Sequence, residues 1–156
     1  MPKARRNTAR HPFDDAIIAA RRRRIAPHEF VLDALAPVAP TTRPMFGCLA
    51  VYVEDKIVLI LRDRHDSPED NGVWLATTAE HHESLLHEFP GMRSIQLLGR
   101  KVTHWQVLAV DLPRFEETAL RACELILARD PRIGKVPKSR ARQVRMSHRN
   151  RSFRLT

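Results

Sequence analysis

The sequence predicts an α+β fold in which an antiparallel sheet of about five strands packs with three helices. Segments rich in β-branched and aromatic residues occur at 46–53, 56–62 and 102–110, as is typical of strands. Apolar residues in 111–130 instead recur with the period of a helix. The predicted strands come in groups between helices, which favours an antiparallel sheet over repeated βαβ units.

The first half of this fold begins with a helix over 27–36, because Pro27 suits a first helical turn. Three prolines between 37 and 44 then keep the chain extended. The strands 46–53 and 56–62 are separated by two residues, which predicts a hairpin. A polar loop over 63–72 leads to a third strand at 73–76.

The next helix is expected to begin at Thr77 and Glu80, which have the spacing of a capping box. Strands at 93–98 and 102–110 follow it. The apolar residues that this helix should bury are Leu85, Leu86 and Phe89.

The closing helix spans 111–130, and its apolar residues lie on one face. This periodicity predicts a stripe buried against the sheet. The stripe consists of Phe115, Ala119, Ala122, Cys123, Ile126 and Leu127.

Charge divides the 156-residue chain into three parts. Residues 1–24 carry a formal charge of +6, residues 25–130 carry −6, and residues 131–156 carry +9 with no acidic residue. The capping and burial patterns lie within the middle part, which predicts an acidic folded domain at 25–130. The sequence therefore predicts a basic N-terminal arm at 1–24 and a basic C-terminal tail at 131–156.

Several classes of protein are disfavoured by what the sequence lacks. No apolar run approaches the ~20 residues of a membrane-spanning helix, so no membrane partner is expected. Two cysteines and no secretory signal favour a cytoplasmic protein with free thiols. The nucleophile-elbow, phosphate-loop and dinucleotide motifs are absent as well, so no cofactor and no enzymatic activity are expected.

The basic tail is the candidate nucleic-acid-binding segment, because clustered Lys and Arg neutralise phosphates and release counterions. Phe153 is its one aromatic residue, so binding should not depend on base sequence. A tail that only aids solubility is the alternative reading of the same charges. The candidate residues are Arg132, Lys135, Lys138, Arg140, Arg142, Arg145, Arg149 and Arg151.

Other polar and aromatic residues receive structural interpretations. The histidines at 81, 82 and 87 and the acidic residues within 63–70 lack the spacing of a metal site, so no metal is expected. Cys48 and Cys123 are expected to be buried thiols. Trp74 and Trp105 are expected to belong to the core.

A short motif precedes the predicted hairpin. The run Arg43, Pro44, Met45, Phe46 and Gly47, followed by a strand from Lys56, resembles the start of the TfoX N-terminal domain family. That domain is related to the YjbR/MmcQ-like α+β fold, and the resemblance covers roughly residues 27–130. It implies a regulatory, non-enzymatic role of the kind known in natural competence.

The chain departs from the TfoX pattern at three places. Asp55 stands where the family has a glycine in the hairpin turn, and Cys48 follows Gly47 in place of a second glycine. A basic tail replaces the TfoX-type C-terminal domain.

Two functional hypotheses follow from the sequence. In the first, the chain is a non-enzymatic binding or regulatory protein that engages a protein partner or forms a homodimer, with nucleic acid contacting its basic ends. In the second, it is a small-molecule binder or an enzyme with a site in a pocket between the sheet and the helices.

Overall fold

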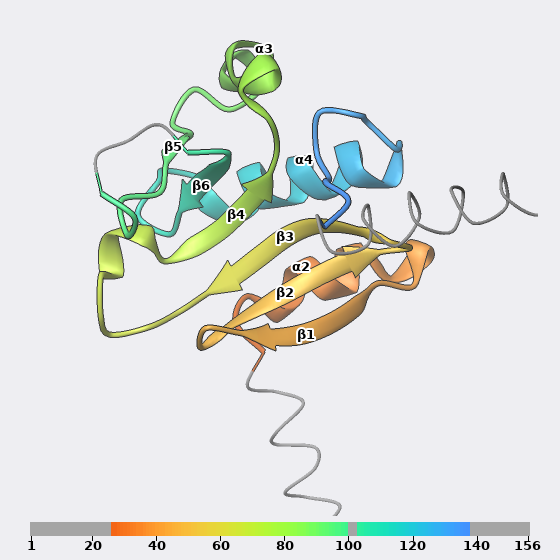
Figure 1. Ribbon diagram of the computed structural model, residues 1–156, viewed down its shortest axis with the longest axis horizontal. Helices are drawn as coiled ribbons and strands as arrows, with labels where there is room; N and C mark the ends of the chain where they lie inside the picture. The colour runs from red at the N-terminus through yellow and green to blue at the C-terminus, as the bar shows by residue number, and fades with distance from the viewer. Residues whose placement is uncertain (1–25, 100–102, 138–156) are drawn as a thin grey trace, which may run out of the picture.

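The computed structural model describes residues 26–99 and 103–137. Its six strands form one antiparallel sheet in the order β1-β2-β3-β4-β6-β5, so the predicted α+β class is confirmed (Figure 1). The strands are β1 (Thr41–Met45), β2 (Cys48–Val53), β3 (Lys56–Arg62), β4 (Gly72–Ala76), β5 (Arg93–Ser94) and β6 (Trp105–Ala109).

Three α-helices accompany the sheet in this part of the chain. They are α2 (Glu29–Ala34), α3 (His82–Glu88) and α4 (Phe115–Leu127). Figure 1 shows α2 and α4 side by side behind the sheet, and α3 beyond the end of β4. Short 3-10 turns occur at η1 (Ala36–Val38), η2 (Pro68–Asp70) and η3 (Ala79–His81). Among the residues described, no helix has the length and apolar character needed to cross a membrane.

The main core lies between the sheet and helices α2 and α4. Alternation along each strand sends one set of side chains to this face. Leu59, Leu75 and Leu108 are fully buried here, and they pack with Val31 of α2 and Ile126 of α4. The apolar stripe predicted for the closing helix is therefore confirmed for its central residues, while Leu127 at the last turn is only half-buried.

The opposite face of the sheet carries a second apolar cluster. Trp105, Val107 and Ala109 point to this face, as the alternation in β6 predicts. Ile60 and Trp74 extend the cluster across β3 and β4. Within the described residues, α2 and α4 pack against the other side of the sheet, and we call the face with the second cluster the open face.

Strand β1 was expected only as an extended segment. It pairs with β2 over its whole length, with Thr41 opposite Tyr52 and Met45 opposite Cys48. Pro44 is tolerated because β1 is an edge strand. One side of an edge strand has no neighbouring strand to bond to, so a residue without an N–H group can face that side without loss of a hydrogen bond. The predicted strand 46–53 therefore begins two residues later, after a turn at Phe46 and Gly47.

Two further expectations about local structure are wrong. Thr78, not Thr77, precedes the first turn, and its hydroxyl donates to Oε1 of Glu80 rather than capping a backbone N–H. Leu86 is 45% exposed, because α3 turns only Leu85 and the adjacent Phe89 toward the core.

The chain remains packed beyond residue 130. Ile133 is buried in the main core, and Lys135 exchanges two backbone hydrogen bonds of 2.9 Å with Ile57 at the start of β3. Arg132 pairs with Asp130 at 2.8 Å and with Glu88 at 3.3 Å. Residues 131–137 thus belong structurally to the folded domain.

Candidate ligand-binding pocket

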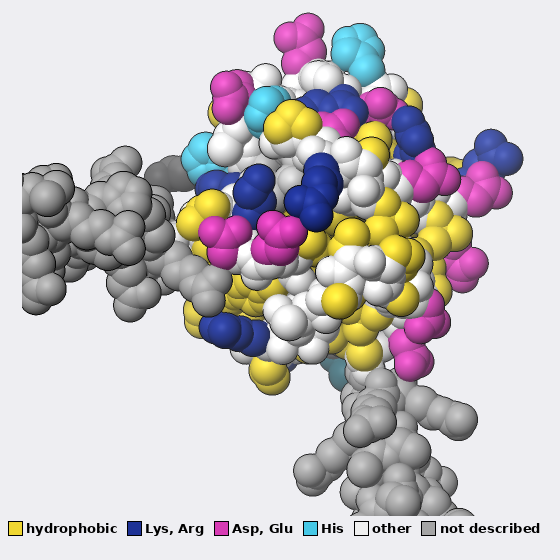
Figure 2. Space-filling view, turned by 90° about the vertical axis from the view of Figure 1, so that its right-hand side faces the viewer, with side chains coloured by type: hydrophobic (Ala, Val, Ile, Leu, Met, Phe, Trp, Pro, Cys, Tyr) yellow, Lys and Arg dark blue, Asp and Glu magenta, His cyan; other side chains and the backbone are white. Residues whose placement is uncertain are grey.

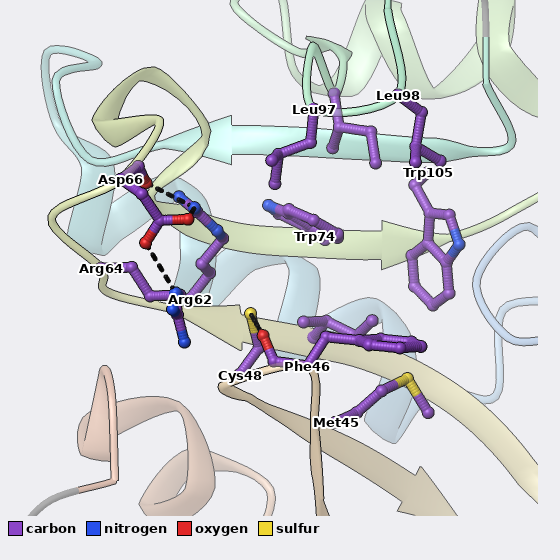
Figure 3. A pocket seen from close by; sticks show the side chains of 12 residues that line it. Met45, Phe46, Cys48, Arg62, Arg64, Asp66, Trp74, Leu97, Leu98 and Trp105 are labelled. Atoms are coloured by element: carbon purple, nitrogen blue, oxygen red, sulfur yellow. Dashed lines mark hydrogen bonds and ion pairs between the residues drawn. The ribbon is translucent and has the colours of Figure 1, made fainter.

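A pocket of about 330 Å³ opens on the face of the sheet opposite α2 and α4 (Figure 3). It therefore lies on the other side of the sheet from the predicted sheet–helix pocket. Its volume is at the lower end of the range found for small-molecule sites. The lining residues are Met45, Phe46, Cys48, Ile60, Arg62, Arg64, Asp66, Trp74, Ile95, Leu97, Leu98 and Trp105.

One half of the pocket is apolar and aromatic. Trp74 and Trp105 lie on neighbouring strands, with ring centroids 6.2 Å apart and planes inclined by 55°. The Trp74 indole is fixed, since its Nε1 donates to the backbone O of Asp70 at 2.8 Å. Figure 3 shows Met45 and Phe46 on one side of the two indoles, and Leu97 and Leu98 on the other.

The other half of the pocket is charged. Arg62, at the end of β3, is only 1% exposed and is held by carbonyl groups of the loop that follows the strand. Its Nη1 donates to Ser67 O at 2.7 Å and to Asn71 Oδ1 at 2.8 Å, and its Nη2 donates to Asp66 O at 2.5 Å. Three of its five N–H groups are thus used in these hydrogen bonds, which fix the position of the guanidinium.

Arg64 and Asp66 form an ion pair beside Arg62. Nε of Arg64 lies 2.8 Å from Oδ1 of Asp66, and this hydrogen bond lowers the pKa of the Asp66 carboxyl below its usual value. Asp66 is therefore ionised at neutral pH. Two guanidinium groups face one carboxylate, which leaves this end of the pocket with an excess positive charge.

Cys48 lies between the two halves of the pocket. Its thiol is half-buried rather than fully buried as expected, and Sγ points to the backbone O of Phe46 at 3.8 Å. Burial raises the pKa of Cys48 above its usual value, although Arg62 and Arg64 oppose the shift. The thiol is protonated at neutral pH and hence a poor nucleophile. Cys123 in α4 is buried, and burial raises its pKa to about 11.

The turn between β1 and β2 forms one wall of the pocket. Phe46 and Gly47 both have positive φ, of 49° and 75°, as a two-residue type I′ turn requires. This conformation is costly for a bulky residue such as Phe46. The Phe46 side chain is also 94% exposed, so it is not held there by burial.

The opposite wall is shaped by Asp70, which is fully buried. Its Oδ2 accepts the backbone N–H groups of Gln96 and Leu97 at 2.9 and 2.8 Å, and its Oδ1 pairs with Arg93 at 3.0 Å. These bonds turn the chain out of β5 and carry Leu97 and Leu98 over the pocket. The predicted strand 93–98 therefore ends after Ser94.

The sequence motif and the pocket coincide in part. Met45 and Phe46 line the pocket, and Gly47 completes the turn above it. Arg43 lies elsewhere on β1, with its guanidinium carbon 5.4 Å from the centre of the Tyr52 ring. The contributions of Arg64, Leu97 and Leu98 were missed. A signal for two of the charged residues was present in the sequence. Arg62, Arg64 and Asp66 occur at every second position from the end of an apolar strand, and this spacing places side chains of an extended chain on the same face.

The predicted nucleic-acid-binding residues are mostly beyond the part of the chain described. Arg132 is occupied by Asp130, Glu88 and Ser84, and Lys135 lies in the backbone bridge to β3. On the face drawn in Figure 2, Lys and Arg side chains lie among Asp and Glu side chains rather than in one basic patch. Outside the described residues lie Lys138, Arg140, Arg142, Arg145, Arg149 and Arg151.

Within 26–99 and 103–137, no group of three or more His, Cys, Asp or Glu side chains could hold a metal ion. In the acidic loop, Asp66 and Asp70 are occupied by arginines and backbone N–H groups. Burial lowers the pKa of His82, with His104 and His81 adding to the effect, so its ring is neutral near pH 7.

Replacing Gly47 with alanine tests how the turn is coupled to the charged end. A Cβ at this position would overlap Nη1 of Arg64, and φ of 75° disfavours any L side chain. We expect the free energy of unfolding to fall by about 1–2 kcal/mol in urea denaturation. In the double variant Gly47→Ala/Arg64→Ala, the second change should recover part of this loss. An equal loss with and without Arg64 would show that the backbone conformation alone matters.

Comparison of the chain with models of known protein families, with curated proteins and with solved structures gives no match.

Proposed function

We propose that this chain is a non-enzymatic binding protein that holds a small molecule with an apolar body in the pocket on the open face of the sheet. The observation that carries the proposal is Phe46. This aromatic side chain is 94% exposed and stands on a backbone conformation that disfavours it, at the rim of a pocket. An exposed apolar side chain on a strained backbone conformation does not stabilise the fold, and such positions are typical of sites that contact a ligand.

The surroundings of Phe46 support the proposal. Trp74 and Trp105 offer a bound molecule two aromatic surfaces, and the fixed Trp74 indole needs no reorganisation on binding. The protonated thiol of Cys48 argues against nucleophilic catalysis in this pocket. The resemblance to the TfoX N-terminal domain suggests in addition a regulatory role, in which binding of the ligand would control the interaction of this chain with a partner protein.

The sequence also suggests contacts with a second copy of the chain and with nucleic acid. Strand β1 lies at an edge of the sheet, as pairing with a second copy would require. Contact of the basic ends with nucleic acid rests on their charge alone.

Intrinsic fluorescence provides a direct test, because the chain has two tryptophans and both line the pocket. We expect 4-phenylbutanol, a neutral aromatic probe, to shift the emission saturably at submillimolar to millimolar concentration. A tryptophan spectrum that does not change up to the solubility limit of the probe would refute the proposal.

The variant Phe46→Asn separates binding from folding. Asn-Gly is the preferred pair for a type I′ turn, so stability should be unchanged or slightly increased. Binding of 4-phenylbutanol should nevertheless weaken several-fold because one wall is removed. The matched control is Val110→Asn, at a 46% exposed residue outside this pocket, which should leave binding unchanged. Equal binding by wild type and Phe46→Asn would contradict a role for Phe46.

A further inference from the structure

The charged end of the pocket indicates which charge the ligand carries. The inference about this charge rests on the proposed function, that the pocket binds a small molecule. Arg62 is held by Ser67, Asn71 and Asp66, so its charge is fixed at the base of this end. Figure 3 shows Arg62, Arg64 and Asp66 at one side of the pocket, Trp74 in the middle and Trp105 at the other side. One molecule lying across the pocket would therefore contact an aromatic surface and a cationic group.

Arg64 is the group best placed to receive a ligand. Its Nε is paired with Asp66, whereas its terminal nitrogens make no hydrogen bond to any residue within the described part of the chain. Its side chain is 40% exposed, so a ligand can reach these nitrogens without unfolding the loop. The planar guanidinium presents paired N–H donors that match the two oxygens of a carboxylate.

The balance of charge indicates how many negative charges the ligand carries. Asp66 offsets one of the two guanidinium groups, and the Cys48 thiol contributes none while it is protonated. An excess charge of one remains beside the apolar lining of the pocket. A singly charged anion neutralises this excess, whereas a neutral ligand leaves it unbalanced and a cation increases it.

We propose that the pocket binds an amphipathic monocarboxylate, with its apolar body against Trp74 and Trp105 and its carboxylate on the terminal nitrogens of Arg64. Phe46 closes over the junction between the two parts of the ligand. Gly47 allows this arrangement, since any side chain there would occupy the position of the Arg64 guanidinium.

A series of probes with one body and three charges tests the proposal. The series is 4-phenylbutanoate, 4-phenylbutanol and 4-phenylbutylammonium, each titrated by tryptophan fluorescence. We expect the carboxylate to bind about tenfold more tightly than the alcohol, as a charge-assisted pair provides, and the ammonium to bind most weakly. Added salt should reduce the preference for the carboxylate.

Two substitutions with opposite expected signs distinguish pairing from a structural effect. Arg64→Gln should abolish the preference for the carboxylate and leave binding of the alcohol within about twofold. Asp66→Asn should tighten carboxylate binding, because it removes the carboxylate that competes for Arg64. A role in folding alone would weaken binding in both variants. The control Arg121→Gln, at an exposed arginine on α4, should change none of the affinities.

The outcomes are distinct for the two proposals. If the alcohol binds as tightly as the carboxylate, or the ammonium binds most tightly, the carboxylate inference is overturned and the binding pocket remains. If none of the three probes binds, the proposed function itself is refuted. If Asp66→Asn weakens carboxylate binding in a folded protein, Arg64 is not the group that holds the anion.

Discussion

Replacing Asp70 with alanine is expected to lower the free energy of unfolding by about 3–5 kcal/mol. The fully buried carboxylate accepts the N–H groups of Gln96 and Leu97 and pairs with Arg93. Its removal leaves the backbone N–H groups of Gln96 and Leu97 without their acceptor and deprives Arg93 of its carboxylate partner. Urea denaturation followed by far-UV circular dichroism measures the loss.

The control for this prediction is Asp63→Ala in the same loop, at an exposed carboxylate. It should change stability by no more than about 0.5 kcal/mol. Asp70→Ala should also weaken binding of 4-phenylbutanol under conditions where the variant is folded, because Leu97 and Leu98 lose their support. A loss below about 1 kcal/mol would mean that water or neighbouring groups replace the carboxylate.

Replacing Gly72 with alanine is expected to cost about 3 kcal/mol or more, for two separable reasons. Its φ of 143° belongs to a region that L side chains rarely adopt. A Cβ at this position would also overlap the carbonyl oxygen of Leu108 on the neighbouring strand, and backbone in the middle of a sheet cannot move aside. Chemical denaturation of the variant measures the combined effect.

Gly99 provides the matched control for the Gly72 substitution. It also has a positive φ, of 93°, but a Cβ there would meet no atom of the described residues within 4 Å. Gly99→Ala should therefore cost only the conformational part, about 1 kcal/mol. Equal losses in the two variants would show that the close approach to Leu108 is not the dominant cause.

The strands were predictable wherever burial alternates along the chain. The segment 56–62 was predicted with the bounds that β3 has, because both faces of this central strand are apolar and its ends are polar. Strand β1 escaped prediction, since three prolines and an exposed burial pattern conceal an edge strand. The bounds of α4 were predicted less closely, because capping decides where a helix ends and periodicity does not.

The pocket was predictable only in part, for a physical reason. Its residues come from β1, β2 and the turn between them, from β3 and the loop after it, and from β4, β6 and the loop after β5, over a span of some sixty residues of the sequence. Their meeting depends on Asp70, whose carboxylate diverts Gln96 and Leu97 from the strand that their apolar neighbours favour. A side chain that redirects a distant backbone segment leaves no periodic signal in either segment.

The bridge between Ile57 and Lys135 has a consequence for how the chain is made. Its two hydrogen bonds join residues far apart in sequence, so the start of β3 cannot be completed until synthesis has passed residue 135. A nascent chain released at residue 130 would lack Ile133 in the core and Arg132 beside Glu88. A truncation meant to remove only the basic tail should therefore end after residue 137 and keep this final closure intact.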